Sequence, residues 1–174
     1  STLPQKIAKP TQTLLPTEIP VIADPPQPPQ PLPPAKDIGR VTDAQGVVSL
    51  RALGGNRWSL AVPGASVLPG DWLRTDMRGA NALRVRLSGG GEITLGPGTL
   101  VEVKDGGAVE LVSGEMEVST QPGKGHALLV RAGTTSLPEL RDGARQVLRR
   151  PEGKDAEVLK KDPNWLLGFK GAVT

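Results

Sequence analysis

The chain has 174 residues with 21 Lys and Arg against 18 Asp and Glu, a net charge of +3, no cysteine, one histidine, three tryptophans and one phenylalanine. A chain without cysteine has no disulfides, thiol catalysis or thiolate zinc site, and one histidine cannot form a multi-histidine metal centre. The small mixed charge and the few aromatic residues argue against nucleic-acid binding. We therefore predict no metal, no cofactor and no nucleic-acid partner. No apolar run reaches the roughly 18 residues of a membrane span, so none is predicted.

Residues 1–36 form a segment of distinct composition. They hold 11 of the 18 prolines and none of the 22 glycines. Proline lacks a backbone donor and has a fixed φ, so this segment cannot form a helix interior or a central strand. The sequence predicts a disordered, extended proline-rich linker with a reach on the order of 100 Å. A spacer is the favoured interpretation, and a ligand for a proline-recognising domain is the alternative.

Residues 37–150 show short segments in which apolar and polar residues alternate. In the clearest, Leu83, Val85 and Leu87 alternate with Arg84 and Arg86. Similar segments cover 92–95, 101–104, 109–111 and 116–118, with glycine-containing turns between them, including one at 113–114. Alternation with this spacing predicts half-buried strands in an all-β fold, as a roll, sandwich or short solenoid of short antiparallel hairpin strands. Residues 37–150 are the predicted β domain.

The C-terminal part is less regular. Residues 126–132 are predicted to form a strand, whereas the pattern over 137–150 fits either a short helix or a hairpin. Residues 151–163 are charged and bounded by prolines, which is typical of a connector. The apolar end, residues 164–174, can pack back on the domain or enter a further one. We predict the second, so that 151–174 form a connector and the start of a possible further domain.

The order of several segments resembles the FecR domain family. They are Gly39-Arg40-Val41, Gly46-Val47-Val48, the Pro-Gly-Asp and Arg-Thr residues within 68–75, Ala82–Leu87, Glu92–Leu95 and Val109–Gly114. The resemblance covers about residues 38–131. Two departures are the turn Ser88-Gly89-Gly90-Gly91, where the family usually has Asp-Gly, and a missing phenylalanine after residues 133–135. Residues 164–174 are similar to sequences that lead from such a domain into a VIT-type domain of large envelope proteins.

The resemblance implies an extracytoplasmic β-rich module, periplasmic or at the cell surface and tethered to a membrane, with any anchor upstream of Ser1. In such proteins the module relays the state of a receptor to a regulator, which makes protein–protein contact or envelope signal transduction the expected function. The expected partner is a protein of the cell envelope. The alternative is a structural or adhesive module of a larger secreted or surface protein that binds cell-wall polymer.

The resemblance also singles out the segment around the Pro-Gly-Asp turn. Pro69, Gly70, Asp71 and Thr75 are interpreted as a structural turn motif, in which Asp71 accepts backbone donors, as Asp does in turns. Arg74 is expected to pair with a neighbouring carboxylate.

Four residues are candidates for contact with a partner. Either Trp72 or Leu73 must be buried, and an exposed Trp72 is the stronger candidate because aromatic and Arg residues dominate binding hot spots. The other candidates are Arg74 and the pair Arg84 and Arg86, which share one strand face and could bind an acidic partner or a glycan.

No arrangement in the sequence is typical of catalysis. The only imidazole, His126, follows Gly-rich residues and is expected near solvent at a strand start. Glu115 and Glu117 lie two apart on one strand face, where a solvated surface is favoured over a catalytic carboxylate pair. We therefore predict no catalytic residues and a protein that is not an enzyme.

Overall fold

The computed structural model describes residues 36–123 and 125–172, which belong to the compact unit Ala35–Thr174. This part of the chain is mostly β-strand with one α-helix and one short 3₁₀ turn, which confirms the all-β prediction. The first strands are β1 (Gly39–Gln45), β2 (Val48–Arg51), β3 (Ser59–Leu60), β4 (Ser66–Val67), β5 (Trp72–Thr75), β6 (Ala82–Leu87), β7 (Gly91–Leu95) and β8 (Leu100–Val103). After the 3₁₀ turn η2 (Asp105–Gly107) come β9 (Val109–Thr120), β10 (Ala127–Leu128), β11 (Val130–Ala132), β12 (Thr135–Ser136), β13 (Leu140–Arg141), β14 (Arg145–Arg150), β15 (Glu157–Val158) and α1 (Asn164–Ala172).

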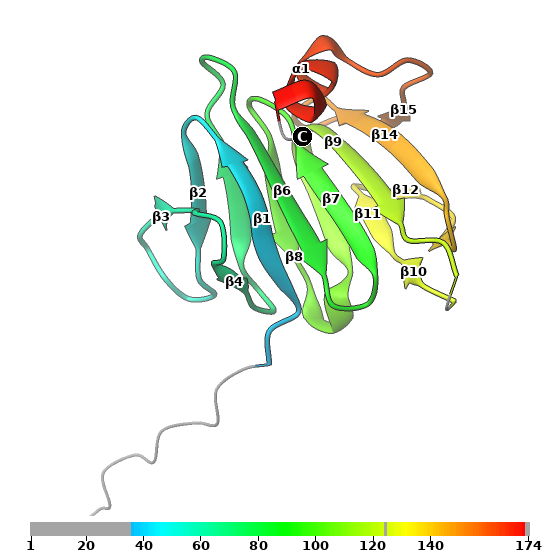
Figure 1. Ribbon diagram of the computed structural model, residues 1–174, viewed down its shortest axis with the longest axis horizontal. Helices are drawn as coiled ribbons and strands as arrows, with labels where there is room; N and C mark the ends of the chain where they lie inside the picture. The colour runs from blue at the N-terminus through cyan, green and yellow to red at the C-terminus, as the bar shows by residue number, and fades with distance from the viewer. Residues whose placement is uncertain (1–35, 124, 173–174) are drawn as a thin grey trace, which may run out of the picture. The chain divides into compact units, whose positions relative to one another are not determined.

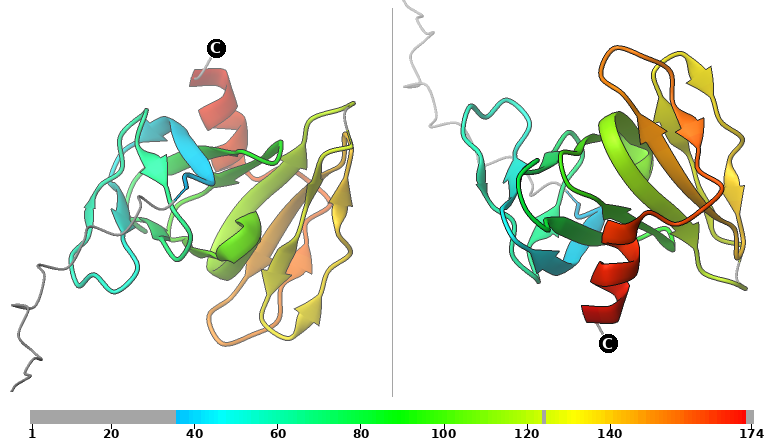
Figure 2. Two further views of the ribbon diagram at one scale, coloured as in Figure 1. Left: turned by 90° about the horizontal axis from the view of Figure 1, so that it is seen from below. Right: turned by 90° about the horizontal axis from the view of Figure 1, so that it is seen from above.

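The main sheet curls into a half-barrel (Figures 1 and 2). Its strand order is β3-β2-β5-β8-β9-β7-β6-β1-β4, so the two end strands, β3 and β4, are consecutive in the chain. The segment between them closes the gap, because the Ala61 amide donates to Val48 O at 2.9 Å and the Val41 amide to Ala65 O at 2.8 Å. Nearly all pairings are antiparallel, and the exception is the parallel contact of β11 with β9. Of the predicted forms, the roll is nearest to this arrangement.

The core fills the inside of the curl. Residues that alternate along each strand point inward and are fully buried, among them Leu73, Leu83, Val85, Ile93, Leu95, Leu111, Met116 and Leu148. Their polar neighbours point outward, as the period-two pattern predicts. The outer surface of the half-barrel is therefore where the polar and functional side chains of the strands lie.

Strand β9 corrects one detail of the predicted strand pattern. Residues 109–120 form one strand instead of two strands separated by a turn at Ser113-Gly114. Gly114 has φ +102°, a left-handed value that lets the strand bend without ending. The first half of β9 pairs with β8 and the second half with β7, so the bend in β9 contributes to the curvature of the sheet. The Thr99 hydroxyl supports the bend by donating to Glu115 O at 3.0 Å and accepting from the Glu115 amide at 3.1 Å.

The segments after β9 are also part of the sheet. Residues 137–150 form strands and not a helix, but these strands do not form a hairpin with each other. β13 pairs with β10, and β14 pairs with β9 along its whole length. Residues 126–132 form β10 and β11 rather than one strand, with Leu129 between them. The predicted connector is likewise tied to the sheet, because β15 pairs with β14 and the Leu159 amide donates to Val147 O at 2.8 Å.

Helix α1 corrects the prediction that the apolar end leaves the domain. Leu166 and Phe169 are buried, and the Trp165 indole N–H donates to Glu115 Oε1 at 2.7 Å. The Phe169 ring lies 5.1 Å from the Arg84 guanidinium carbon, on the outer side of β6. The helix packs back on the sheet because Trp165 and Lys170 donate to Glu115 and Glu117 and Phe169 lies against Arg84. Residues 151–172 therefore belong to the same compact unit as the strands.

The predicted linker, residues 1–36, lies outside the described residues except for Lys36. Among the helices that the structure describes, none has the length and apolar character needed to cross a bilayer.

Candidate functional site

A tight turn positions β5 at the start of the candidate site. The Asp71 amide donates to Leu68 O at 3.1 Å, and Gly70 has φ +88° after Pro69, the combination of a type II turn. Asp71 accepts the Leu68 amide on Oδ2 at 2.8 Å, so its carboxylate bonds within the turn. Thr75 ends the strand as a buried residue whose hydroxyl donates to Gly96 O at 2.5 Å and accepts from the Thr99 amide at 2.9 Å.

The Asp71 carboxylate gives a pH-dependent prediction. Burial raises the pKa of Asp71, because the loss of water outweighs the stabilisation of the carboxylate by the Leu68 amide. The folded state then holds the proton more tightly than the unfolded state, so Asp71 costs stability as the pH rises above about 4. We expect Asp71→Asn, which keeps the acceptor, to gain stability over the wild type with rising pH in urea unfolding. Asp71→Ala should lose about 1 kcal/mol with the hydrogen bond at low pH. A pH-independent difference between Asp71→Asn and wild type would contradict this account.

The site itself is a stack of arginine and tryptophan side chains on the outer surface of β2 and β5. In the β2–β5 register Arg51 lies opposite Trp72, and Ser49 opposite Arg74. Trp58, just before β3, covers both arginines: the Arg74 guanidinium carbon lies 4.0 Å from its ring centroid and that of Arg51 5.1 Å. Arg51 also lies 5.4 Å from the Trp72 ring centroid. These distances are within the range of cation–π interactions.

We call this surface the Arg–Trp face. The register places Ser49, Arg51, Leu60, Trp72, Arg74, Leu100 and Glu102 on one side of neighbouring strands. Trp58 joins them because its ring lies against both arginines. Both tryptophans are half-buried, and Leu60 is 66% exposed. Leu53, Val47 and Met77, in the adjoining loops, are also exposed large apolar residues. An apolar and aromatic area of this kind is unusual on the surface of a monomer unless it serves as a contact.

Many arginines of the described chain are paired with carboxylates, whereas those of this face, like Arg131, are not. Arg84, Arg86, Arg145 and Arg149 each have a carboxylate within ion-pair distance. Among residues 36–123 and 125–172 no carboxylate pairs with Arg51 or Arg74. The nearest strand offers Glu102 opposite Trp72, but Lys104 pairs with it at 3.0 Å, and this hydrogen bond raises the pKa of Lys104.

A hollow of about 460 Å³ adjoins Arg74. Its wall is part apolar, from Val47, Met77 and Leu100, and part polar, from the hydroxyls of Ser49 and Ser113. Asp76 also lines it, and Asp76 Oδ1 accepts the Arg78 amide at 3.3 Å within its own turn. The hollow therefore combines one cation, one carboxylate, hydroxyl groups and an apolar wall.

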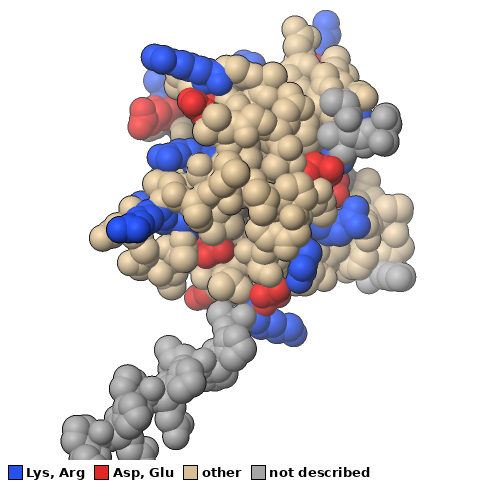
Figure 3. All heavy atoms as spheres, turned by 60° about the vertical axis from the view of Figure 1, so that its left-hand side comes forward, with Lys and Arg blue, Asp and Glu red and all other residues tan. Residues whose placement is uncertain are grey.

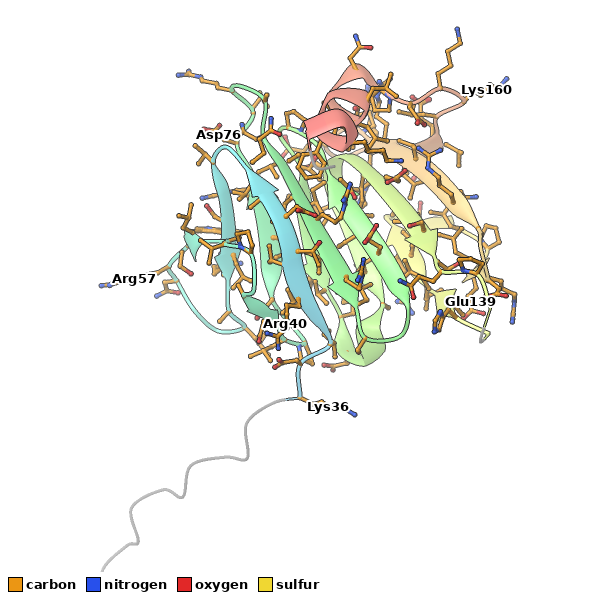
Figure 4. All side chains as sticks on the ribbon, in the orientation of Figure 1. Lys36, Arg40, Arg57, Asp76, Glu139 and Lys160 are labelled. Atoms are coloured by element: carbon orange, nitrogen blue, oxygen red, sulfur yellow. The ribbon has the colours of Figure 1, made fainter. Side chains whose placement is uncertain are left out.

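Figures 3 and 4 show the surroundings of this part of the molecule. Figure 3 brings the side with the β3 and β4 edges forward, and much of its area is uncharged with charged side chains toward the margins. In Figure 4, Arg57 extends away from the turn before β3, and Asp76 lies at the loop after β5. Arg57, next to Trp58 in the chain, and Arg78, in the loop after β5, are two further exposed cations.

The structure separates the predicted contact residues into two groups. Trp72 and Arg74 belong to the Arg–Trp face, with Leu73 as the buried neighbour. Arg74 lies against the ring of Trp58, and among the described residues no carboxylate is within ion-pair distance of it, unlike the prediction. Arg84 and Arg86 do share an outer face, on the other half of the sheet, but Arg84 pairs with Asp43 at 3.3 Å and Arg86 with Glu92 at 3.4 Å. Since neighbouring carboxylates neutralise both, they are poor candidates for an acidic partner.

The remaining candidates for chemistry have structural surroundings. Glu117 is buried and pairs with both Arg145 and Lys170, and Glu115 pairs with Arg149 at 2.6 Å. These carboxylates are thus neither a solvated face nor a free pair, because they hold α1 and β14 against β9. His126 lies just before β10 and is partly exposed. In the described part of the chain, no three His, Asp or Glu residues gather as metal ligands do.

Sequence reasoning missed Trp58 and Arg51 as members of the site. Trp58 and Leu60 alternate with Ser59, as Arg51 and Ser49 alternate with Leu50, so both pairs were recognisable as strand positions. Their approach to Trp72 and Arg74 depends on the β3-β2-β5 order, which alternation along each strand does not specify.

No protein-family model, curated protein or solved structure matches the chain. The resemblance to the FecR domain family therefore stays a prediction.

Proposed function

We propose that this chain is a non-enzymatic module that contacts another protein through the Arg–Trp face. The observation that carries the proposal is the exposed stack of Trp58 and Trp72 with two arginines that no described carboxylate neutralises. Trp and Arg are the residues most enriched in binding hot spots, because they bury much area and still offer polar groups. Stacking also orders both arginine side chains, which lowers the entropy lost on binding.

The resemblance to FecR domains supports a place for this contact in an extracytoplasmic envelope assembly, where the module relays a signal or holds a neighbour. The Arg–Trp face favours a protein over a bare cell-wall glycan as the partner. Sugar rings bind flat on open aromatic faces, whereas guanidinium groups already cover the rings of Trp58 and Trp72.

The experiment is site-specific photo-crosslinking in cells of the source organism. A photoreactive residue replaces Leu60 on the Arg–Trp face, or Val158 on β15 as the control, since both are exposed apolar side chains outside the core. We expect a defined adduct with one protein at position 60 and none at 158, and its loss when Trp72→Ala is added. Equal adducts at both positions, or an adduct at 60 that Trp72→Ala leaves unchanged, would contradict the proposal.

A further inference from the structure

The Arg–Trp face also indicates the chemistry of its partner, an inference that rests on the proposed function. We infer that the face binds an extended peptide segment with carboxylates at alternate positions and an apolar side chain beyond them. The two carboxylates would pair with Arg51 and Arg74, and the apolar side chain would enter the hollow beside Arg74.

The guanidinium groups of Arg51 and Arg74 have hydrogen-bond donors that are available to a partner. A guanidinium has five N–H donors in its plane, in a fork that matches a carboxylate. The Arg51 guanidinium lies against the rings of Trp58 and Trp72, and the Arg74 guanidinium lies against the ring of Trp58. Among the described residues, none accepts a hydrogen bond from either side chain. Two guanidinium groups without acceptors favour carboxylates over neutral groups, because their hydrogen bonds to a carboxylate are charge-assisted and can be bidentate.

The spacing of Arg51 and Arg74 matches that of alternate residues in an extended peptide. Arg51 lies opposite Trp72 and Arg74 opposite Ser49, so the two arginines are diagonal neighbours across the β2–β5 pair. Such positions are about 7–8 Å apart. In an extended peptide, residues i and i+2 point to the same side about 7 Å apart. Alternate acidic residues of one extended segment therefore match the two arginines, whereas consecutive ones point to opposite sides.

The hollow beside Arg74 can hold the apolar side chain of the peptide. It begins at Arg74 and has an apolar wall from Val47, Met77 and Leu100. Met77 is 78% exposed and unbranched, so it can adapt to an incoming side chain. An apolar residue two positions beyond the second carboxylate continues on the same side of the peptide and reaches this wall. The exposed cations Arg57 and Arg78 favour the approach of a negatively charged segment.

The test uses a synthetic fluorescent peptide, SGETETLGS, with the 174-residue chain in a titration followed by anisotropy. We expect saturable binding that weakens with added salt, and about tenfold weaker binding of the matched peptide SGQTQTLGS. Arg51→Gln and Arg74→Gln should each weaken binding of the acidic peptide about tenfold. Arg131→Gln is the matched control, because Arg131 is an exposed arginine on β11 without a described carboxylate partner, and it should change binding less than twofold.

Equal binding of the acidic and the neutral peptide would overturn the inference, as would equal effects of Arg131→Gln and Arg74→Gln on binding. Alginate that binds as tightly as the acidic peptide would also overturn it, because the face would then bind any polyanion. Arg74→Lys checks for misfolding, since it keeps the charge and should keep the melting temperature but lose most of the binding through the fork. If the peptide fails to bind while the adduct at position 60 forms and depends on Trp72, the proposed function stands and only the partner chemistry is wrong.

Discussion

Gly114→Ala should lower the free energy of unfolding by about 4 kcal/mol, because it adds a backbone clash to a strained φ. Gly114 has φ +102°, where any side chain is strained. A Cβ there would lie 2.5 Å from Thr99 Cα and 2.8 Å from Gly98 O, which are backbone atoms that cannot turn away. Because β9 bends at this residue, relief of the clash would separate β8 from β9.

The matched control for this substitution is Gly107→Ala. Gly107 also has a left-handed φ, +84°, but a Cβ there would meet nothing within 4 Å. Its cost is therefore the backbone strain alone, about 1–2 kcal/mol. Urea unfolding of both variants, followed by tryptophan fluorescence, separates strain from clash. Equal losses for the two substitutions would contradict the close packing of Thr99 against the bend.

Glu117→Ala should cost about 2 kcal/mol and loosen helix α1. The Glu117 side chain is 6% exposed and accepts from Arg145 and from Lys170, at 2.7 Å for the lysine. Its removal leaves two cations without their shared acceptor. The cost stays below that of a fully buried pair because Arg145 keeps Asp162 and because Lys170 can reach water.

Hydrogen exchange of the α1 amides measures this effect directly. We expect faster exchange over residues 164–172 in Glu117→Ala, with the amides of β6 and β7 unchanged. Glu92→Ala is the control, because Glu92 pairs with Arg84 and Arg86 at 3.9 and 3.4 Å on a more exposed surface. It should cost less than about 1 kcal/mol. Unchanged exchange of α1 in Glu117→Ala would mean that Leu166 and Phe169 alone hold the helix.

The strands were predictable where one face of the sheet is buried and the other is exposed to solvent. Leu83, Val85 and Leu87 alternate with Arg84 and Arg86, and β6 has this pattern of burial. The Pro69-Gly70 turn was predictable for a local reason, since proline fixes φ and glycine accepts a positive φ. Both features depend only on neighbours in the sequence.

Features that depend on distant contacts were not predictable. Ser113-Gly114 has the composition of a turn, yet Thr99, fifteen residues before Gly114, converts it into a bend within one strand. The apolar end of the chain packs back because Glu115 and Glu117 accept from Trp165 and Lys170, about 50 residues away. No local pattern specifies these pairings.

The candidate site was half predictable for the same reason. Trp72 and Arg74 stand in one strand and could be proposed together, whereas Trp58 and Arg51 join them only through the strand order. Arg84 and Arg86 had the same local pattern as a binding pair but are neutralised by Asp43 and Glu92 from other strands. The spacing along each strand showed which side chains share a face. Only the pairing of the strands showed that Arg51 and Arg74 lack a carboxylate partner among the described residues, whereas Arg84 and Arg86 have one.

The most direct test of the central claim compares two tryptophans in binding to the partner isolated by crosslinking at position 60. Trp72 belongs to the Arg–Trp face, and Trp165 belongs to helix α1. If the face makes the contact, Trp72→Ala should weaken the affinity by about 2 kcal/mol, roughly 30-fold, while Trp165→Ala changes it less than about twofold. Melting curves of both variants confirm that each remains folded at the temperature of measurement. An unchanged affinity of folded Trp72→Ala, or a larger loss for Trp165→Ala, would contradict the account.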